Sequence, residues 1–167
     1  TSFSKQRKIT TQITPDGKAL NFPCYTPESI AYMVRNLRLL NDKVLIQKYI
    51  TFIENEVNKA YKLSFDQDKG IIKKNKHFSE MRDHYIKKSS MYTNSMLFML
   101  SNELNKLKLL NPFKGYNFKK IQKDFFWTGD YFLDDLSGNV HVAGDANTFP
   151  FWTQNFTSKK MFKSCLN

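Results

Sequence analysis

Short connections between helix-like segments constrain the fold of this 167-residue chain more than any other feature. Apolar residues recur every three or four positions over residues 26–40 and again over 43–60, and a two-residue break separates these stretches. This spacing is typical of amphipathic helices, and so short a connection forces the two helices to pack antiparallel. A second pair, over 91–109 and 117–126, follows the same pattern. We therefore expect an all-α fold built from antiparallel helix pairs.

Capping residues and apolar positions indicate where these helices begin and which faces they bury. Thr26 is a suitable N-cap, and Pro27 fits the first helical position, where its missing N–H costs nothing. Asp42 is expected to cap the second helix, and Thr157 or Ser158 a last helix near residue 166. The positions expected to face inward are Ile30, Met33, Val34, Leu37 and Leu40, then Leu45, Tyr49, Ile53, Val57 and Ala60, then Met96, Leu97, Leu100, Leu104 and Leu107, and finally Met161, Phe162 and Leu166.

Two long segments, about 63–90 and 127–157, separate these helices. In the second, YFLDD and VHVAG flank the turn signal SGN at 137–139, which predicts a small β-hairpin. The stretch GDANTFPFW at 144–152 contains Gly and Pro, which oppose helix formation, so it is expected to be irregular.

Helices that alternate in direction place both long segments at the same end, and loops that gather in this way commonly form a binding site. Stacked helix pairs either close into an α/α toroid or extend as a solenoid, which is built from regular repeats. The sequence shows no such repeat, so a partial toroid is favoured. Residues 1–167 then form a single domain or a fragment of a larger α/α-barrel catalytic domain.

The net charge of +11, from 26 Lys and Arg against 15 Asp and Glu, raises the question of a nucleic-acid partner. Clustered cations gain affinity for nucleic acid by releasing phosphate counterions. The lysines are scattered, however, and only KGIIKKNK and YIKKSS resemble a basic patch. A solvated, lysine-coated helical surface is the simpler interpretation, so nucleic acid is not the expected partner.

Several classes of protein are disfavoured by what the sequence lacks. No apolar run approaches the roughly 20 residues that a membrane span requires, and residues 1–12 lack the apolar core of a signal peptide. We therefore expect no membrane partner and favour the cytoplasm. Cys24 and Cys165 lie far apart and outside metal-ligand spacings, so neither a disulfide framework nor a zinc site is expected, and no cofactor is implied.

The densest group of titratable residues is HFSEMRDHY at 77–85, which contains Glu80, Arg82, Asp83 and His84. Acid and base catalysis at a glycosidic bond needs one protonated carboxyl group to donate to the leaving oxygen and one ionised carboxylate to activate water. Glu80 is a candidate for the donor. The alternative is a surface salt-bridge cluster in which Arg82 pairs with Asp83, and the spacing leaves both possibilities open.

The segment SEMRDHYIKKSSMYTNSMLFMLSNEL at 79–104 resembles the glucoamylase-like glycosidases, whose general acid lies in a Trp-Glu-x-Arg segment before a helix that opens with Ser or Thr. Glu80-Met81-Arg82 matches the Glu-x-Arg part, and Ser79 stands where the family usually has Trp. GDANTFPFWTQNFTSKKMF at 144–162 is similar to a later family segment, an Asp-Ala-Ser-like turn followed by apolar residues, a loop and a Thr-capped helix.

The resemblance implies a ring of six helix pairs that binds sugar at its loop end and hydrolyses α-linked glucosides with inversion. Glu80 would be the general acid, and Arg82 and Asp83 would bind sugar hydroxyls or tune Glu80. The family's general base lies on a later part of the barrel. The rest of the barrel then belongs either to a second chain or fragment that completes it, or to a part removed by proteolysis or truncation. The alternative is a non-catalytic helical module that binds carbohydrate or, through its basic surface, nucleic acid.

Asp145 and Trp152 are further candidates for binding an oligosaccharide or polysaccharide substrate. Asp145 is expected at the loop rim, where its carboxylate either accepts hydrogen bonds from sugar hydroxyls or caps the local turn. Trp152 either stacks on a sugar ring or joins Phe149 and Phe151 in the core beneath the rim.

Trp127, Asp130 and the adjacent acids Asp134 and Asp135 belong to the same loop and could bind substrate in the same way. Adjacent acidic residues on a hairpin are usually solvated turn residues, however. His141 alternates with Val140 and Val142, so it is expected to point to the opposite side of a strand and to have a structural role.

Overall fold

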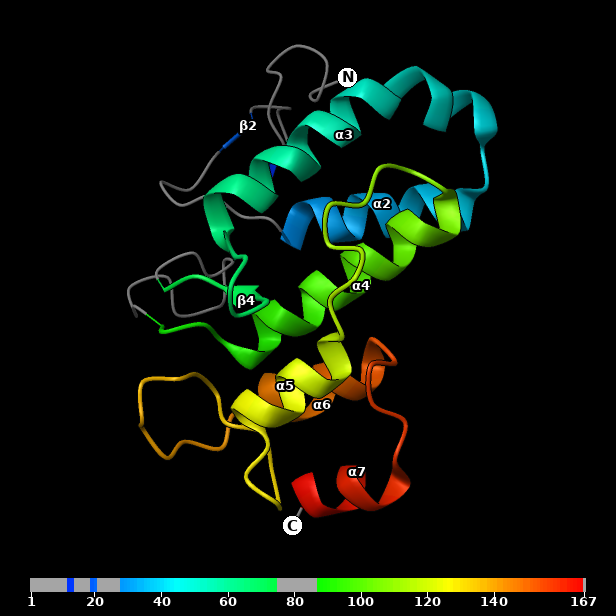
Figure 1. Ribbon diagram of the computed structural model, residues 1–167. Helices are drawn as coiled ribbons and strands as arrows, with labels where there is room; N and C mark the ends of the chain where they lie inside the picture. Colours follow the sequence, from blue (N-terminus) through cyan, green and yellow to red (C-terminus); the bar gives the residue numbers. More distant parts are fainter. Residues whose placement is uncertain (1–11, 14–18, 21–27, 75–86, 167) are drawn as a thin grey trace.

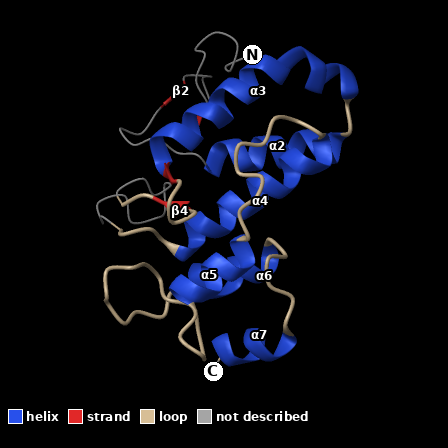
Figure 2. Cartoon of the chain, in the orientation of Figure 1, coloured by secondary structure: helices blue, strands red, loops and turns tan. Residues whose placement is uncertain are grey.

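The computed structural model describes residues 12–13, 19–20, 28–74 and 87–166, and most of these residues are helical. The helices are α2 (Glu28–Leu40), α3 (Lys43–Ser64), α4 (Met91–Leu107), α5 (Phe118–Phe126), α6 (Gly144–Trp152) and α7 (Lys159–Cys165). The described strands are short and come before α2 and between α3 and α4 (Figure 2). The predicted all-α class is therefore confirmed.

Side-chain caps define the starts of several helices. The Asp42 carboxylate caps α3, the Asn117 side chain caps α5 and the Ser158 hydroxyl caps α7. Each accepts a hydrogen bond from the third backbone amide of its helix, which satisfies one of the donors that a helix start leaves unpaired. The caps predicted at Asp42 and Ser158 are confirmed, whereas Thr26 and Pro27 lie outside the described residues.

The helices alternate in direction, and their long connections lie at one end (Figure 1). The hairpin after α3 and the loop after α5 are both at the left of the view, and the turn between α2 and α3 is at the right. A backbone bridge between Ser90 and Asp135 joins the stretch that leads into α4 to the loop after α5. The two long segments therefore meet at the N-terminal end of α4.

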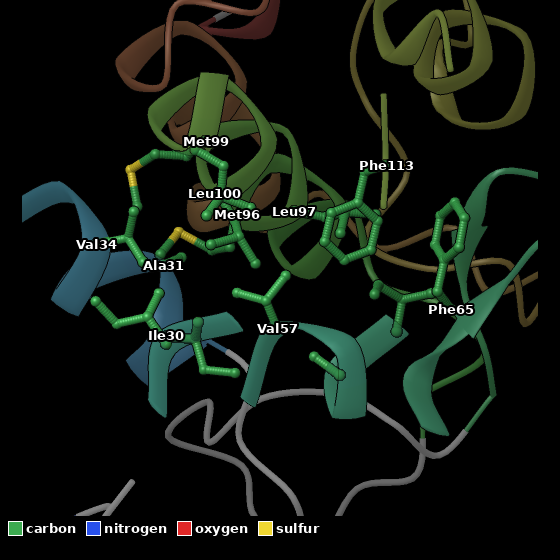
Figure 3. Packing of buried hydrophobic residues seen from close by; sticks show 14 of the residues in the cluster. Ile30, Ala31, Val34, Val57, Phe65, Met96, Leu97, Met99, Leu100 and Phe113 are labelled. Atoms are coloured by element: carbon green, nitrogen blue, oxygen red, sulfur yellow. The ribbon is translucent and has the colours of Figure 1, made fainter. Parts of the chain in front are cut away.

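The main hydrophobic core lies between α2, α3 and α4 (Figure 3). Ile30 and Val34 of α2, Val57 of α3, and Met96 and Leu100 of α4 are almost fully buried in it. α4 packs most extensively against α2 and then against α6. It is the central helix of the described structure.

Three positions that were expected to face inward are exposed instead. Leu40 is 67% exposed at the end of α2, Leu166 is 64% exposed just after α7, and Phe162 on α7 is also exposed. Apolar periodicity identifies one face of a helix. It does not tell how far the neighbouring elements extend over that face. Leu40 and Leu166 lie at helix ends, and Phe162 is covered on one side, by Phe151.

The hairpin predicted around residues 137–139 is wrong. Asp135 forms its backbone bridge with Ser90 and not with a strand on the other side of the turn. Val140, His141 and Val142 are all exposed and irregular. An alternating sequence is stabilised as a strand by packing on one face, and the exposure of both valines shows that this packing is missing here.

The described strands pair elsewhere. They are β1 (Gln12–Ile13), antiparallel to β2 (Ala19–Leu20), and β3 (Phe65–Asp66), antiparallel to β4 (Ile71–Ile72). In the turn between β3 and β4, the Asp66 carboxylate accepts hydrogen bonds from the Asp68 and Lys69 amides. Gly70 has a φ of 71°, and a Cβ there would lie 2.7 Å from the Ile121 side chain. Glycine is thus required for both conformation and space.

GDANTFPFW forms helix α6, so the expectation of irregular structure is wrong. Gly144 is only the first residue of this helix, and Pro150, which lacks the N–H of a helical bond, stands near its end. The Asn147 side chain accepts a hydrogen bond from the Phe132 amide at 2.8 Å and donates one to the Phe132 carbonyl at 3.1 Å. These tertiary bonds outweigh the weak intrinsic helix propensity.

A chain of buried amide side chains joins α4 to several neighbouring segments. Asn94 Oδ1 accepts from the Ile72 amide of β4 at 3.0 Å, and Asn94 Nδ2 donates to Ser89 Oγ at 3.0 Å. Gln122 Nε2 of α5 donates to the backbone carbonyl of Asn94 at 2.7 Å, and Asn155 Nδ2 donates to Gln122 Oε1 at 2.6 Å. Buried polar groups are costly without partners, so the complete chain favours one arrangement of these segments.

Replacing Asn94 with alanine should destabilise the fold strongly. Asn94→Ala leaves the buried Ile72 amide and Ser89 hydroxyl without the partner they have in the folded chain. We expect the free energy of unfolding to fall by about 2–4 kcal/mol, measured by urea denaturation followed by circular dichroism. Asn102→Ala, at a partly exposed position of the same helix, is the control and should change it by less than about 0.5 kcal/mol. Equal effects would contradict the role given to the amide chain.

Candidate functional site

The predicted catalytic residue Glu80 and the predicted substrate-binding residues Arg82 and Asp83 lie outside the described residues. The structure therefore does not test their roles. It does describe residues 87–90, through which this segment enters α4.

Residues 87–90 are held against the loop after α5 by buried polar contacts. Lys87 Nζ lies 2.9 Å from Asp134 Oδ1, and both side chains are almost completely buried. The Lys88 amide donates to Asp135 Oδ2 at 2.9 Å, and the Met91 amide donates to the Asp134 carbonyl at 2.9 Å. The end of the segment that contains Glu80 is thereby fixed to the loop that leads to α6.

Asp134 and Asp135 are buried, so the expectation that they are solvated turn residues is wrong. Burial alone raises the pKa of the Asp135 carboxyl, but hydrogen bonds from Ser137 and Lys88 and the charge of Lys87 outweigh it. The pKa therefore lies below its ordinary value of 3.8. The two carboxylates serve to join the loops and are not available at the surface to bind a ligand.

The lowered pKa of Asp135 predicts acid-sensitive stability. Its folded pKa is below its unfolded pKa of about 3.9, so the stabilisation is present above that pH and is lost as the pH falls through the folded value. Asp135→Asn should cost about 1–3 kcal/mol at pH 7, and the difference in melting temperature from the wild type should narrow steadily below pH 4. Asp130→Asn, at an exposed position, should match the wild type throughout. A constant difference for Asp135→Asn from pH 7 to 3 would contradict this account.

Trp127 and Asp130 lie in the same loop but have local contacts. The Trp127 ring packs edge-on against Phe132 with centroids 4.8 Å apart. Asp130 is exposed in a turn in which Thr128 Oγ1 accepts hydrogen bonds from the Asp130 and Tyr131 amides. Trp127 also packs against a hydrophobic cluster that includes Ala146 of α6.

Asp145, Phe149 and Trp152 lie four and three residues apart, so they share one face of α6. Asp145 Oδ1 accepts a hydrogen bond from the Ala146 amide at 2.8 Å in the first turn of the helix. The N-cap of α6 is Ala143, and no described side chain caps the helix start, so both roles suggested for Asp145 stay predictions. Phe149 is partly buried, whereas Trp152 is 46% exposed.

An aromatic seam runs between α2 and α6 over the first turns of α4. We define the seam as Tyr32, Arg35, Tyr92, Phe149 and Trp152. The Trp152 ring lies 5.3 Å from Phe149 and 6.3 Å from Tyr32, measured between centroids. The Arg35 guanidinium stands 4.4 Å above the Trp152 ring, and Phe149 meets Tyr92 edge-on at 4.6 Å.

Glu28 places a buried carboxylate beside the seam. The Tyr92 hydroxyl donates to Glu28 Oε2 at 3.0 Å. Burial, the charge of Glu28 and the neighbouring Tyr32 hydroxyl raise the pKa of Tyr92 far above its ordinary value, so this phenol remains a hydrogen-bond donor. Glu28, Tyr32 and Arg35 share one face of α2 through the same spacing of four and three residues. Glu28 was not among the predicted site residues, because its partner Tyr92 lies 64 residues further along the chain.

The seam combines aromatic ring surface with phenol hydroxyls and a guanidinium, and the Glu28 carboxylate lies beside it. Aromatic rings with a few well-placed polar groups are typical of sites that bind small molecules and sugars. In the described part of the chain, no group of His, Cys, Asp and Glu side chains is arranged to hold a metal ion. Nor does any helix within those residues combine the length and the hydrophobicity needed to cross a bilayer.

Comparison of the chain with protein-family profiles, with curated proteins and with solved structures finds no match.

Proposed function

We propose that this chain binds an oligosaccharide or polysaccharide along the aromatic seam, and that it is a glycoside hydrolase of the glucoamylase-like type or part of such a catalytic domain. The observation that carries the proposal is the half-exposed Trp152 ring, which stands beside Tyr32 and Arg35 on the helix face that begins with Asp145. An indole offers an apolar surface to the C–H face of a sugar, and the polar groups around it can bind hydroxyls.

The helix arrangement supports a partial α/α toroid as the setting for this site. Successive helices run antiparallel, and the long connections lie at one end (Figure 1). The contacts of residues 87–90 with Asp134 and Asp135 hold two of these connections together. In the proposal these helices are one part of a ring that further helix pairs complete.

Catalysis in this proposal depends on Glu80 as the general acid. Glu80 protonates the leaving oxygen, and a carboxylate from the rest of the barrel activates water on the opposite face of the sugar, so that the configuration inverts. Arg82 and Asp83 bind sugar hydroxyls or tune Glu80. The fixed position of residues 87–90 supports a shared rim, because it holds the end of this segment near the loop that leads to Asp145.

Saccharide binding without catalysis is the second candidate. The two acids described near the seam are both hydrogen-bonded, Glu28 to the Tyr92 hydroxyl and Asp145 to the Ala146 amide. Carboxylates engaged in this way favour binding over acid and base catalysis. A nucleic-acid partner has less support. Lys87 of the YIKKSS stretch is buried against Asp134 and contributes no charge to the surface.

Removing the Trp152 ring should weaken saccharide binding. We expect Trp152→Ala to lower the affinity for a linear oligosaccharide of glucose by about 10-fold, the value of a stacked aromatic contact of roughly 1–1.5 kcal/mol. Isothermal titration calorimetry measures the change. Val44→Ala, which removes an exposed apolar side chain of α3 outside the seam, should leave the affinity unaltered. Equal affinities of Trp152→Ala and the wild type would exclude the seam as the binding surface.

Replacing the proposed acid should stop turnover without preventing binding. In the assembled enzyme, Glu80→Gln should reduce sugar release by at least about 100-fold, because general acid catalysis contributes that much, and should leave the dissociation constant nearly unchanged. Asp124→Asn, at an exposed position of α5, should retain full activity. Undiminished sugar release by Glu80→Gln would eliminate Glu80 as the acid and would leave the binding proposal standing.

A further inference from the structure

Arg35 is a half-buried cation whose hydrogen bonding is mostly unused. Its guanidinium stacks on Trp152 at 4.4 Å and donates to the Met99 sulfur at 3.2 Å. A thioether is a weak acceptor, and a guanidinium carries five N–H donors. Among the described residues, no carboxylate lies within ion-pair distance of Arg35.

Arg38, one turn further along α2, forms an ion pair within the described residues, in contrast to Arg35. Its guanidinium bonds to the buried carboxylate of Glu103, which also accepts from Lys106. The acids nearest to the seam are engaged elsewhere, because Glu28 accepts from Tyr92 and Asp145 from a backbone amide. Arg35 therefore differs from its neighbour by having its charge available at a surface.

The stacking on Trp152 gives this charge a defined position. A guanidinium laid on a ring and bonded to a sulfur loses less freedom on binding than a flexible side chain, and its planar fork matches a carboxylate. The same indole is the surface proposed to stack on a sugar. A ligand that contacts the ring thus brings its substituents within reach of Arg35.

We infer that the saccharide bound along the seam is acidic, with a carboxylate such as that of a uronic acid residue, and that Arg35 is the specificity-determining residue that pairs with this carboxylate. The inference rests on the proposed saccharide-binding function and narrows its substrate class. Arg35 lies seven residues from Glu28, about 10 Å along α2. The uronic acid residue then occupies the Trp152 end of the seam, and a neutral sugar residue lies nearer to Glu28, whose carboxylate would repel an acidic one.

The test compares two ligands that differ only in one group: a linear trisaccharide of glucose, and the same trisaccharide with its non-reducing end oxidised to glucuronic acid. Calorimetry should show that the wild type binds the acidic ligand about 10-fold more tightly, as expected for a partly exposed, charge-assisted pair. Arg35→Gln should abolish this preference, so that the ratio of the two affinities falls from about 10 to about 1. Arg35→Lys should retain only part of the preference, because an ammonium lacks the planar fork.

The control variant is Lys48→Gln. Lys48 also lies over an aromatic ring, that of Tyr49 at 5.5 Å, but outside the seam, so the preference should persist. Circular dichroism and melting temperatures establish that each variant is folded.

Two results overturn the inference, and they differ in what they say of the proposed function. Equal binding of both ligands by the wild type, with both weakened by Trp152→Ala, removes the acidic specificity and retains the seam as a sugar site. Binding of neither ligand at millimolar concentration removes both. A preference that survives in Arg35→Gln would assign the specificity to another cation and would also overturn the role of Arg35.

Discussion

The buried hydrogen bonds of Asn94 are the constraint on which the rest of the described structure depends. Its side chain accepts a hydrogen bond from the Ile72 amide of β4 and donates one to the Ser89 hydroxyl before α4. Its backbone carbonyl accepts a hydrogen bond from the Gln122 side chain of α5. Hydrophobic burial brings helices together without fixing their register closely. Directional bonds between fully buried groups do fix it, because a shift of one helix would leave several of them unpaired.

The position of α4 then determines both regions that are proposed to bind substrate. The residues just before α4 join the two long segments, through the Ser90 bridge to Asp135 and the ion pair of Lys87 with Asp134. Tyr92 of α4 contacts Phe149 of α6. α2, which carries Glu28 and Arg35, packs against α4. The loop rim and the aromatic seam are thus two consequences of one central helix that is unusually rich in buried polar side chains.

Local signals predicted the helices well and failed where distant contacts decide the structure. The Asp42 and Ser158 caps and the buried face that includes Val57 follow from neighbours in the sequence. α6 could not be foreseen, because the bonds that hold it come from Asn147 to Phe132. The missing hairpin has a similar cause, since Asp135 bonds to residues that precede α4.

The candidate site was predicted only in part for the same physical reason. Trp152 could be proposed from its own surroundings, but its partners Tyr32 and Arg35 belong to a helix far away in the sequence. Helical spacing shows that Glu28, Tyr32 and Arg35 share a face. It does not show that this face meets α6, and that meeting is what turns a common surface pattern into a candidate site.

The two sides of the seam also give it a mechanical property. α2 and α6 are each fastened to α4, and at the seam they meet mainly through side chains that stack across the gap, above all Arg35 on Trp152. A ligand that contacts both helices would strengthen the contact between α2 and α6, which otherwise depends mainly on Arg35 and Trp152. Ligand binding would then slow amide hydrogen exchange in α6, the short helix whose own sequence least favours helix formation.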